Sequence, residues 1–591
     1  MWRKDFMAVF ILLLSWTSWA QSSEDMDRIM DLIGCGSPED IDGYEVERLS
    51  SYLERPLKLN LAPPSTLRSC GLFTEFQAVS LVDYRTRHGD ILSYGELAGV
   101  DGFTDEVVRI LSPFITLEGG SVVRDSYGQG RSDHDMSARG GLKFSGTEIQ
   151  GNYGFKYRLT SGRGLSLSLA ASSSNSETLD APDSFSGYVG YDFGKVPLRL
   201  VLGDFNARFG QGLAFWNGMS MTGLSKAASF MKSASGISSS WSFTGSSAHT
   251  GLACEYAFSR FRLVSLVAFP GIRNGKVNVL PALNFGWTGK NMCASVTHYQ
   301  EIVPMSGKMD AYMSDMKTAT DVAMCLRGTD VFAEVAFDWV NMAAAVLAGT
   351  RFAAGEDGTM AAHLRFYPAA FNPSRSSASR TVSKCSNEYG ASVCYGYSPM
   401  SKAFSCDVSL DSAYLPVTKE EGKVSVHARL LAEASIKISD TFSVNLRLSE
   451  RYRTWGRNPF KTDVRADLAW SDSSFSVTGR LNVLNYIQTG FLTYVEGGYK
   501  TDKFSLHIRQ MYFMVDEWDD RIYAYERDAP GNYSVPAFYG RGLNTALMLS
   551  WKFSRWGRLY LKGTMTTYPF MAGQKKKSGT AGLKLQSVFS F

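Results

Sequence analysis

The chain ends in the stretch Ala581-Gly-Leu-Lys-Leu-Gln-Ser-Val-Phe-Ser-Phe591, in which apolar and polar side chains alternate. Successive side chains of a β-strand point to opposite faces, so a period of two gives the strand one apolar and one polar face. The apolar face carries Leu583, Leu585, Phe589 and Phe591. The stretch therefore predicts a β-strand that runs to an aromatic residue at the end of the chain.

The same period of two continues from about residue 136 to the C-terminus. Clear examples are the stretches 149–159, 404–410, 442–448 and 464–470. Many segments are about 9–12 residues long, the length that a tilted strand needs to cross hydrocarbon. Roughly 455 residues at about 18–20 per strand and connection give roughly 22–26 strands, an even number if both ends of the barrel sequence lie on one side.

Two β architectures fit this pattern, a soluble sandwich or array and a membrane barrel. Charged residues in mid-strand, such as Arg447 and Asp467, would be solvated outside a sandwich or inside a barrel lumen. So many strands favour the barrel, since an open sheet of that size would curl or expose its edges. Tryptophans near segment ends suit the girdles at membrane interfaces. These residues are Trp216, Trp287, Trp470, Trp551 and Trp556.

The N-terminal 20 residues have the pattern of a signal peptide, with a charged start, a short apolar run and small residues before a cut. A terminal strand ending in Phe591 resembles the assembly signal of Gram-negative outer-membrane barrels. This resemblance implies outer-membrane lipid and the barrel-assembly machinery as partners. With both ends in the periplasm, Lys575, Lys576 and Lys577 would face the anionic outer leaflet, although a solvated basic loop explains them equally well.

Residues 21–117 have a helical pattern instead of an alternating one. Within part of this stretch, capping signals mark where individual helices begin and end. Thr74 with Gln77, and Ser93 with Glu96, have the spacing of capping boxes, and Gly89 fits a helix C-terminus. We therefore expect N-terminal helices over 21–56, a small all-α domain over 57–117 and a linker over 118–135 before the barrel at 136–591.

The stretch 57–117 resembles the helix-hairpin-helix domain of competence-type DNA receptors, through its Leu59-Asn-Leu61 entry, its Asp83-Tyr-Arg85 segment and its paired turns. Together with the barrel it resembles a family of large outer-membrane proteins that carry such a head. The segments 202–213 and 539–542 also resemble recurrent stretches of that family. The resemblance implies a fold for the head and a phosphate-contacting role for its turns.

The hairpin turns are degenerate for phosphate binding. A helix N-terminus that follows a glycine-rich turn can hold a phosphate with its backbone N–H groups. Gly71 and Gly102 begin the two turns, but each turn lacks the second glycine, and acidic residues open the following helices. The residues left to contact a phosphate or a protein partner are Gly71, Gly102, Arg68, Arg85, Arg87 and Arg109.

The charge distribution also disfavours DNA binding by the head. Residues 21–117 contain 17 acidic and 8 basic residues, a net charge of −9, whereas the whole chain has a net charge of +4 and residues 118–591 about +12. Non-specific affinity for DNA comes mainly from basic side chains that neutralise phosphates. We expect the acidic head to dock on the basic barrel or on a periplasmic protein.

No catalytic motif or metal-ligand spacing stands out in the sequence, and the seven histidines are scattered. Gly210-Gln-Gly212 is too short for a phosphate cradle and predicts a bend or constriction. Cys385 and Cys394 leave open either a disulfide or two thiols. We predict a non-enzymatic outer-membrane channel, transport or docking protein without a cofactor, whose head plugs the lumen or recruits a partner. DNA uptake through the head is the alternative.

Overall fold

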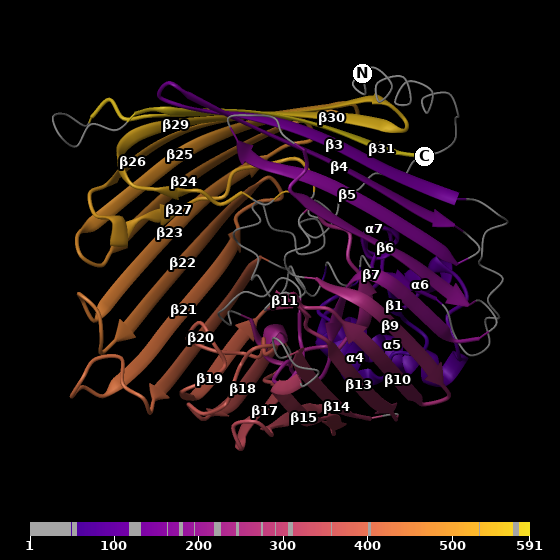
Figure 1. Ribbon diagram of the computed structural model, residues 1–591. Helices are drawn as coiled ribbons and strands as arrows, with labels where there is room; N and C mark the ends of the chain where they lie inside the picture. Colours follow the sequence, from indigo (N-terminus) through magenta and orange to yellow (C-terminus); the bar gives the residue numbers. More distant parts are fainter. Residues whose placement is uncertain are drawn as a thin grey trace.

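The computed structural model describes a four-helix head followed by a large β-barrel (Figure 1). The described residues are 49, 52, 56–117, 132–161, 164–176, 181–193, 196–217, 226–243, 248–273, 276–289, 291–304, 311–355, 357–399, 403–530, 532, 534–570 and 578–591. The predicted signal peptide, residues 118–131 of the predicted linker and nearly all of 21–56 lie outside them, whereas residues 132–135 already belong to a barrel strand.

The barrel is a closed antiparallel ring of 24 strands, within the predicted 22–26. The ring strands are β3 Ser132–Ser145, β4 Glu148–Ser161, β5 Leu165–Ser176, β6 Ser184–Phe193, β7 Leu198–Arg208, β9 His249–Phe258, β10 Phe261–Ala268, β13 Leu280–Thr288, β14 Met292–Pro304, β15 Ala311–Leu326, β16 Thr329–Asp338, β17 Ala343–Ala353, β18 Gly358–Tyr367, β19 Glu388–Tyr397, β20 Phe404–Leu415, β21 Ser425–Lys437, β22 Phe442–Arg453, β23 Phe460–Ser471, β24 Phe475–Asn485, β25 Thr489–Lys500, β26 Phe504–Val515, β29 Gly540–Ser554, β30 Gly557–Thr567 and β31 Thr580–Ser590.

The final strand closes the ring, because β31 pairs with both β30 and β3. Ser590 lies opposite Asp135 in this closing pair, and the N–H of Phe591 donates to the carbonyl of His134. Closure leaves no strand edge exposed along the ring, which removes the usual site of edge-to-edge aggregation. The ends of the barrel sequence lie at one rim, called here the terminal rim. The opposite one is the loop rim.

Short segments accompany the ring at the loop rim and inside it. They are η3 Ala227–Phe230, β8 Gly236–Ser239, β11 Ile272–Arg273, β12 Lys276–Val277, η5 Trp518–Asp520, β27 Ile522–Tyr523 and β28 Ala537–Phe538. Three connections that leave the loop rim are buried against the inner wall. Loop A comprises the described residues 209–217 and 226–243, loop B is 368–387, and loop C comprises 516–530, 532 and 534–539.

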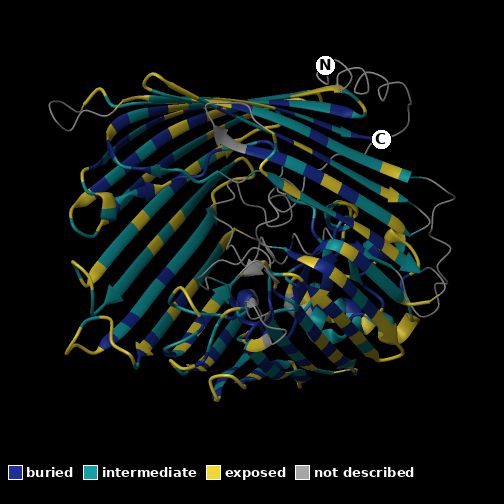
Figure 2. Cartoon of the chain, viewed as in Figure 1, coloured by how far each residue is buried: buried dark blue, intermediate teal, exposed yellow. Residues whose placement is uncertain are grey.

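The outer wall of the barrel is apolar, as the alternation predicted. Leu583 and Leu585 of β31 are 46% and 48% exposed, whereas the alternate residues Gln586 and Ser590 are buried inside. Figure 2 shows the same alternation of exposed and buried positions along the other strands. A closed antiparallel barrel with an apolar outer face and a polar interior is the architecture of outer-membrane barrels.

Aromatic side chains mark the terminal rim. Trp287, Trp470 and Trp551 lie one to three residues from the ends of their strands at this rim, and Trp556 lies in the turn between β29 and β30. These four positions agree with an interfacial girdle. The prediction for Trp216 was wrong, because this residue belongs to loop A and is buried inside the barrel.

The head comprises α4 Pro64–Ser69, α5 Glu75–His88, α6 Tyr94–Ala98 and α7 Asp105–Leu111, tied at its base by the parallel pair β1 Leu57–Lys58 and β2 Ile115–Thr116. Its own apolar core includes Leu67, Leu81 and Leu97. The helices that the structure describes are all too short or too polar to serve as a bilayer-spanning segment. Helix α4 contacts β15, and the Tyr52 hydroxyl lies 3.4 Å from that of Ser233 in loop A.

Two of the predicted helix caps are confirmed in the head. The Thr74 hydroxyl accepts from the N–H of Gln77, whose side chain accepts in return from the N–H of Thr74. Ser93 caps α6 by accepting from the N–H of Glu96. The Glu96 carboxylate departs from the expected box, because it accepts from the N–H of Leu92 instead of that of Ser93.

Candidate functional site

The interior of the barrel is the candidate site, since its inward side chains form a dense polar network. Many charged groups there are paired across neighbouring strands. Examples are Arg351 with Asp330 at 2.6 Å and Arg480 with Asp467 at 2.5 Å. A buried charge is tolerated only when a partner and hydrogen bonds compensate for its desolvation. Mid-strand charges such as Asp467, which the sequence left open to the outside of a sandwich or the lumen of a barrel, thus lie in the lumen.

One carboxyl group of the inner wall holds the glycine bend of loop A. Glu334 lies on the inward face of β16, and its carboxyl accepts hydrogen bonds from three backbone N–H groups of the loop. These are the N–H groups of Gln211 at 2.6 Å, Leu213 at 3.1 Å and Ala214 at 3.2 Å. All four residues are buried. The loop forms a cradle of N–H groups around a carboxyl group of its own chain.

Two glycines give loop A the bend that this cradle requires. Gly210 and Gly212 have φ values of +58° and +84°, in the left-handed region that favours glycine. A Cβ atom on Gly210 would lie 2.9 Å from the carboxyl carbon of Glu334. The bend predicted for Gly210-Gln-Gly212 is confirmed, and its function is to bring backbone N–H groups onto the wall.

Loop A also reaches the opposite side of the interior. Its 3-10 helix η3 packs against β17, β18 and β19. Its later residue Phe243 accepts from the Ser172 hydroxyl of β5 through its carbonyl, at 2.9 Å, and lies 3.8 Å from the Arg139 guanidinium of β3. The loop therefore spans the lumen between two distant parts of the wall.

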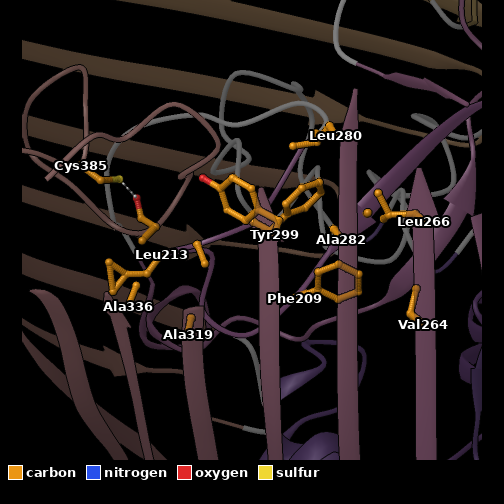
Figure 3. Packing of buried hydrophobic residues seen from close by; sticks show 14 of the residues in the cluster. Phe209, Leu213, Val264, Leu266, Leu280, Ala282, Tyr299, Ala319, Ala336 and Cys385 are labelled. Atoms are coloured by element: carbon orange, nitrogen blue, oxygen red, sulfur yellow. Dashed lines mark hydrogen bonds between the residues drawn. The ribbon is translucent and has the colours of Figure 1, made fainter. Parts of the chain in front are cut away.

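Loop B joins loop A through backbone hydrogen bonds. The N–H of Ser377 donates to the carbonyl of Gly212 at 2.8 Å, and the N–H of Trp216 donates to that of Arg375 at 3.0 Å. Apolar residues seal this junction, and Figure 3 shows Phe209, Leu213 and Cys385 from the loops together with the wall residues Tyr299 and Ala336 of the same cluster. The two loops form one plug.

Buried polar clusters anchor loop B to the wall. The Asp315 carboxylate of β15 accepts from the Tyr299 hydroxyl at 2.8 Å, from the Lys317 ammonium and from the Ser374 hydroxyl of the loop. Lys317 also donates to Tyr299 at 2.9 Å. Arg375 of the loop pairs with Glu301 of β14 at 3.1 Å.

A second anchor lies at the base of loop B around Arg365 of β18. Its guanidinium pairs with Glu388 at 2.8 Å and with Asp411 at 2.7 Å. The same guanidinium donates to the hydroxyl groups of Ser392 and Thr381, each at 2.7 Å. All of these groups are buried or partly buried, so one arginine holds the loop to β18, β19 and β20.

Loop C enters the lumen separately and is fixed by charge. Arg527 pairs with Glu496 of β25 at 2.6 Å, and Asp528 accepts from Lys562 at 3.1 Å and from Lys584 at 3.0 Å. A cavity of about 340 Å³ remains between this loop and the wall around β3–β5 and β29–β31. Its lining includes Arg139, Asn152, Ser172, Asp528, Asn532 and Lys584.

Among the seven cysteines within the described regions, no disulfide joins Cys385 to Cys394. The Cys385 thiol donates to the carbonyl of Ala378 within loop B, at 3.4 Å. Of the two alternatives that the sequence left open, the structure has the thiols. In the described part of the chain no three His, Cys, Asp or Glu side chains come together as a metal site.

Arg85, one of the predicted contact residues of the head, is occupied within the domain. Its guanidinium donates to the carbonyl groups of Leu59 at 3.1 Å, Ala62 at 2.7 Å and Asn60 at 2.6 Å. Desolvation by partial burial lowers its pKa from the ordinary arginine value. Arg85 therefore positions the entry of the head against α5, and its donors are turned away from any external phosphate.

The remaining described contact residues of the head lie in its two turns and on α5 and α7. Gly71 and Gly102 do adopt positive φ values of 70° and 85°, and the Gln77 side chain donates to the carbonyl of Gly102 at 2.8 Å. Arg87 pairs with Asp83 at 3.0 Å on α5. Arg109 lies 3.8 Å from Glu106 on α7.

Four predicted contact side chains cannot be placed by the structure. The backbone of Arg68 belongs to α4, but its side chain is outside the described part of the chain. Lys575, Lys576 and Lys577 also lie outside the described residues. Their predicted contacts stay predictions. In the described head, each basic residue of the phosphate hypothesis has a carboxylate or carbonyl neighbour, so no observation favours DNA uptake.

The sequence matches no protein-family model and no curated protein. Among solved structures, similar chains include the P pilus usher PapC translocation pore, with TM-score 0.38 and 9% identity over 78% of this chain and 99% of that one. Others are the copper transporter OprC, with TM-score 0.42, 9% identity and coverages of 78% and 80%, and the FrpB iron transporter from Neisseria meningitidis, with TM-score 0.36, 9% identity and coverages of 77% and 81%. At TM-scores below 0.5 these similarities carry no conclusion about this chain.

Sequence reasoning missed the anchors of the plug. Glu334, Lys317 and Arg365 each stand in an alternating strand, and the period of two would have placed them on the inward face. The loop residues that bond to Glu334 lie 120 to 123 positions away from it in the sequence. In the Asp315 cluster the separation reaches 59 positions. No local pattern reports contacts over such separations.

Proposed function

We propose that this chain is a non-enzymatic channel or transport protein of the outer membrane, whose own loops plug the lumen and regulate passage. One observation carries the proposal: loops A and B form a joined plug that is tied to the inner wall by polar contacts. Polar anchors inside a lumen can exchange for water when a loop moves, whereas the apolar cluster between the loops and the wall favours the closed plug.

The membrane placement draws support from the outer wall. Large apolar side chains such as Leu364, Leu410 and Val495 are exposed there, at 67%, 47% and 59%. Burying such a band in hydrocarbon is favourable, at about 25 cal/mol per Å² of apolar surface. The same outer wall supports outer-membrane lipid as a partner, and the barrel-assembly machinery is proposed as a second partner.

Passage through the plugged barrel is testable by liposome swelling. We expect wild-type protein to give slow swelling in small sugars, and a variant lacking residues 373–384 of loop B to give faster swelling. A variant lacking 418–423, an exposed connection between β20 and β21, serves as the control. Equal swelling rates for both deletions, with the heat-modifiable gel shift of a folded barrel retained, would reject the plug.

For the head we propose a docking role in the periplasm, on the barrel or on a protein partner. The opposite charges of residues 21–117 and 118–591 support attraction between them, and α4 already touches β15. Such attraction is screened by salt, with a Debye length of about 10 Å at 0.1 M. In the full-length protein we expect protease protection of the head to fall as salt rises, and protection independent of salt would contradict charge-driven docking.

A further inference from the structure

A cavity of about 240 Å³ lies inside the barrel where loop B faces strands β20–β23, near the loop rim. Its lining holds five cationic side chains and two carboxylates. The cations are Arg380, Arg429, Arg451, Arg453 and Lys461, and the carboxylates are Asp411 and Asp463. This excess of positive charge contrasts with paired charges of the lumen such as Arg351 with Asp330.

The strand register places like charges directly opposite one another in this cavity. Arg429 of β21 pairs in register with Arg451 of β22, which in turn lies opposite Lys461 of β23. Directly opposed like charges destabilise a β-sheet. Neighbouring strands are only about 4.8 Å apart, so three cations stand in one row across about 10 Å of wall. A row of this kind is stabilised when an anion lies among its members.

Several donors in the cavity have no hydrogen-bond partner among the residues that the structure describes. The Nε atoms of Arg451 and Arg453 are buried and make no hydrogen bond to any described residue, and neither arginine has an ion-pair partner there. His427, which is 3% exposed, lies opposite Arg453 in register. Neither of its ring nitrogens has a hydrogen-bond partner among the described residues. The guanidinium of Arg451 instead lies 5.2 Å from the centre of the Tyr486 ring.

The carboxylates of the cavity are engaged by residues other than Arg451 and Arg453. Asp411 lies opposite Arg429 in register, and it is held by Arg365 at 2.7 Å and by the hydroxyl groups of Ser392 and Thr381. Asp463 accepts from the Asn482 side chain at 2.6 Å. Unused guanidinium donors therefore face a cavity whose acids are already committed to other partners.

We propose that this cavity binds a phosphate-type oxyanion, either free phosphate or the phosphate group of an organic ester. Guanidinium groups offer forked N–H donors that match two oxygens of a phosphate, and several cations together suit a multivalent anion better than chloride. The inference deepens the proposed function, because it names a class of solute for the lumen. Phosphate binding can nevertheless be measured without any passage through the barrel.

The test is calorimetric titration of the full-length protein in detergent with inorganic phosphate, glucose 6-phosphate and, as a neutral control, glucose. We expect phosphate or its ester to bind and glucose not to bind. The double variant Arg451→Gln plus Arg453→Gln should raise Kd at least about tenfold, the effect of losing about 1.4 kcal/mol. The matched control is Arg447→Gln, an inward arginine of the same strand that pairs with Glu433 at 3.3 Å, and it should change Kd less than twofold.

Tighter binding of inorganic phosphate than of glucose 6-phosphate would identify the free ion as the ligand, and the reverse order would identify an organic phosphate. Absence of heat with both, or equal Kd values for the double variant and the wild type, would overturn the proposal. Loss of liposome swelling with phosphate binding intact would instead reject the proposed channel function alone.

A second measurement needs no substitution and covers a double variant that fails to fold. Phenylglyoxal modifies accessible arginines, and peptide mass spectrometry reports which ones. Phosphate should protect Arg451 and Arg453 of the wild-type protein from modification while leaving exposed Arg87 and Arg109 reactive. Equal modification of Arg451 and Arg453 with and without phosphate would also reject the site.

Discussion

Replacement of Glu334 by alanine removes the carboxyl group that accepts from three N–H groups of loop A. The N–H groups of Gln211, Leu213 and Ala214 are buried together with this carboxyl group. In the closed plug the variant therefore leaves the three N–H groups without their acceptor. When the loop swings away from the wall, water can satisfy all three. The substitution therefore destabilises the closed state more than the open state.

The magnitude follows from the number of buried donors. A buried N–H group without an acceptor costs about 1–3 kcal/mol. Relaxation of the loop can rescue some donors, so one uncompensated N–H group gives a lower bound. The ratio of open to closed plug should then rise roughly 5- to 150-fold. Glu334→Gln keeps one acceptor oxygen and should have a smaller effect.

The assay is single-channel recording of the purified protein in planar lipid bilayers, which reports open probability directly. The control is Glu433→Ala, which removes an inward glutamate of β21 that pairs with Arg447 and does not touch the plug. We expect frequent openings for Glu334→Ala and wild-type behaviour for the control. Identical open probabilities for the two variants would refute the role of the carboxyl cradle.

Other predictions concern the head and the barrel surface. Arg85→Ala should lower the free energy of unfolding of the head by about 1.5–3 kcal/mol, because it removes the charged donors of three carbonyl groups. Arg87→Ala removes only an exposed ion pair and should lower it by less than about 0.5 kcal/mol. Hydrogen exchange in the full-length protein measures both effects, and equal effects would contradict the structural role of Arg85. Hydrogen bonds from the Leu92 N–H and the Tyr84 hydroxyl lower the pKa of Glu96. The stability that these bonds give the head is therefore complete above the unfolded pKa of 4.5 and is lost as pH falls through the lower folded pKa. Exchange protection of the Leu92 amide should fall in this pH range, and unchanged protection would contradict the role of Glu96. Removal of detergent should aggregate the full-length protein, and a monodisperse folded protein in plain buffer would disprove the lipid-facing wall.

The alternation of side chains was sufficient to predict most of the barrel. A period of two over hundreds of residues leaves few alternatives, and the strand count follows from length because each crossing needs a fixed number of residues. The caps of α5 and α6 were equally local, since a cap joins residues three positions apart. Trp216 was misplaced because a loop that folds into the lumen has the same composition as a strand end at an interface.

The head shows where residue types without geometry mislead. Arg85 was grouped with Arg87 as a surface contact, since both are basic and lie two positions apart on one helix. A spacing of two places them on different sides of the helix, and only the packed structure shows that one side meets the carbonyl groups of 59–62. Residue types alone are equally insufficient for the lumen. The cations of the phosphate cavity come together only because the register between strands places them opposite one another.

The sequence by itself determined that the chain forms a long antiparallel barrel with an apolar outer wall, because strand periodicity is encoded between neighbouring residues. Only the tertiary structure decided that loops A and B join inside the barrel and which wall residues anchor them. It also decided which inward charges pair and which remain for a ligand. Those outcomes depend on contacts between residues far apart in the chain, where closure of the ring and strand register set the distances that local patterns do not contain.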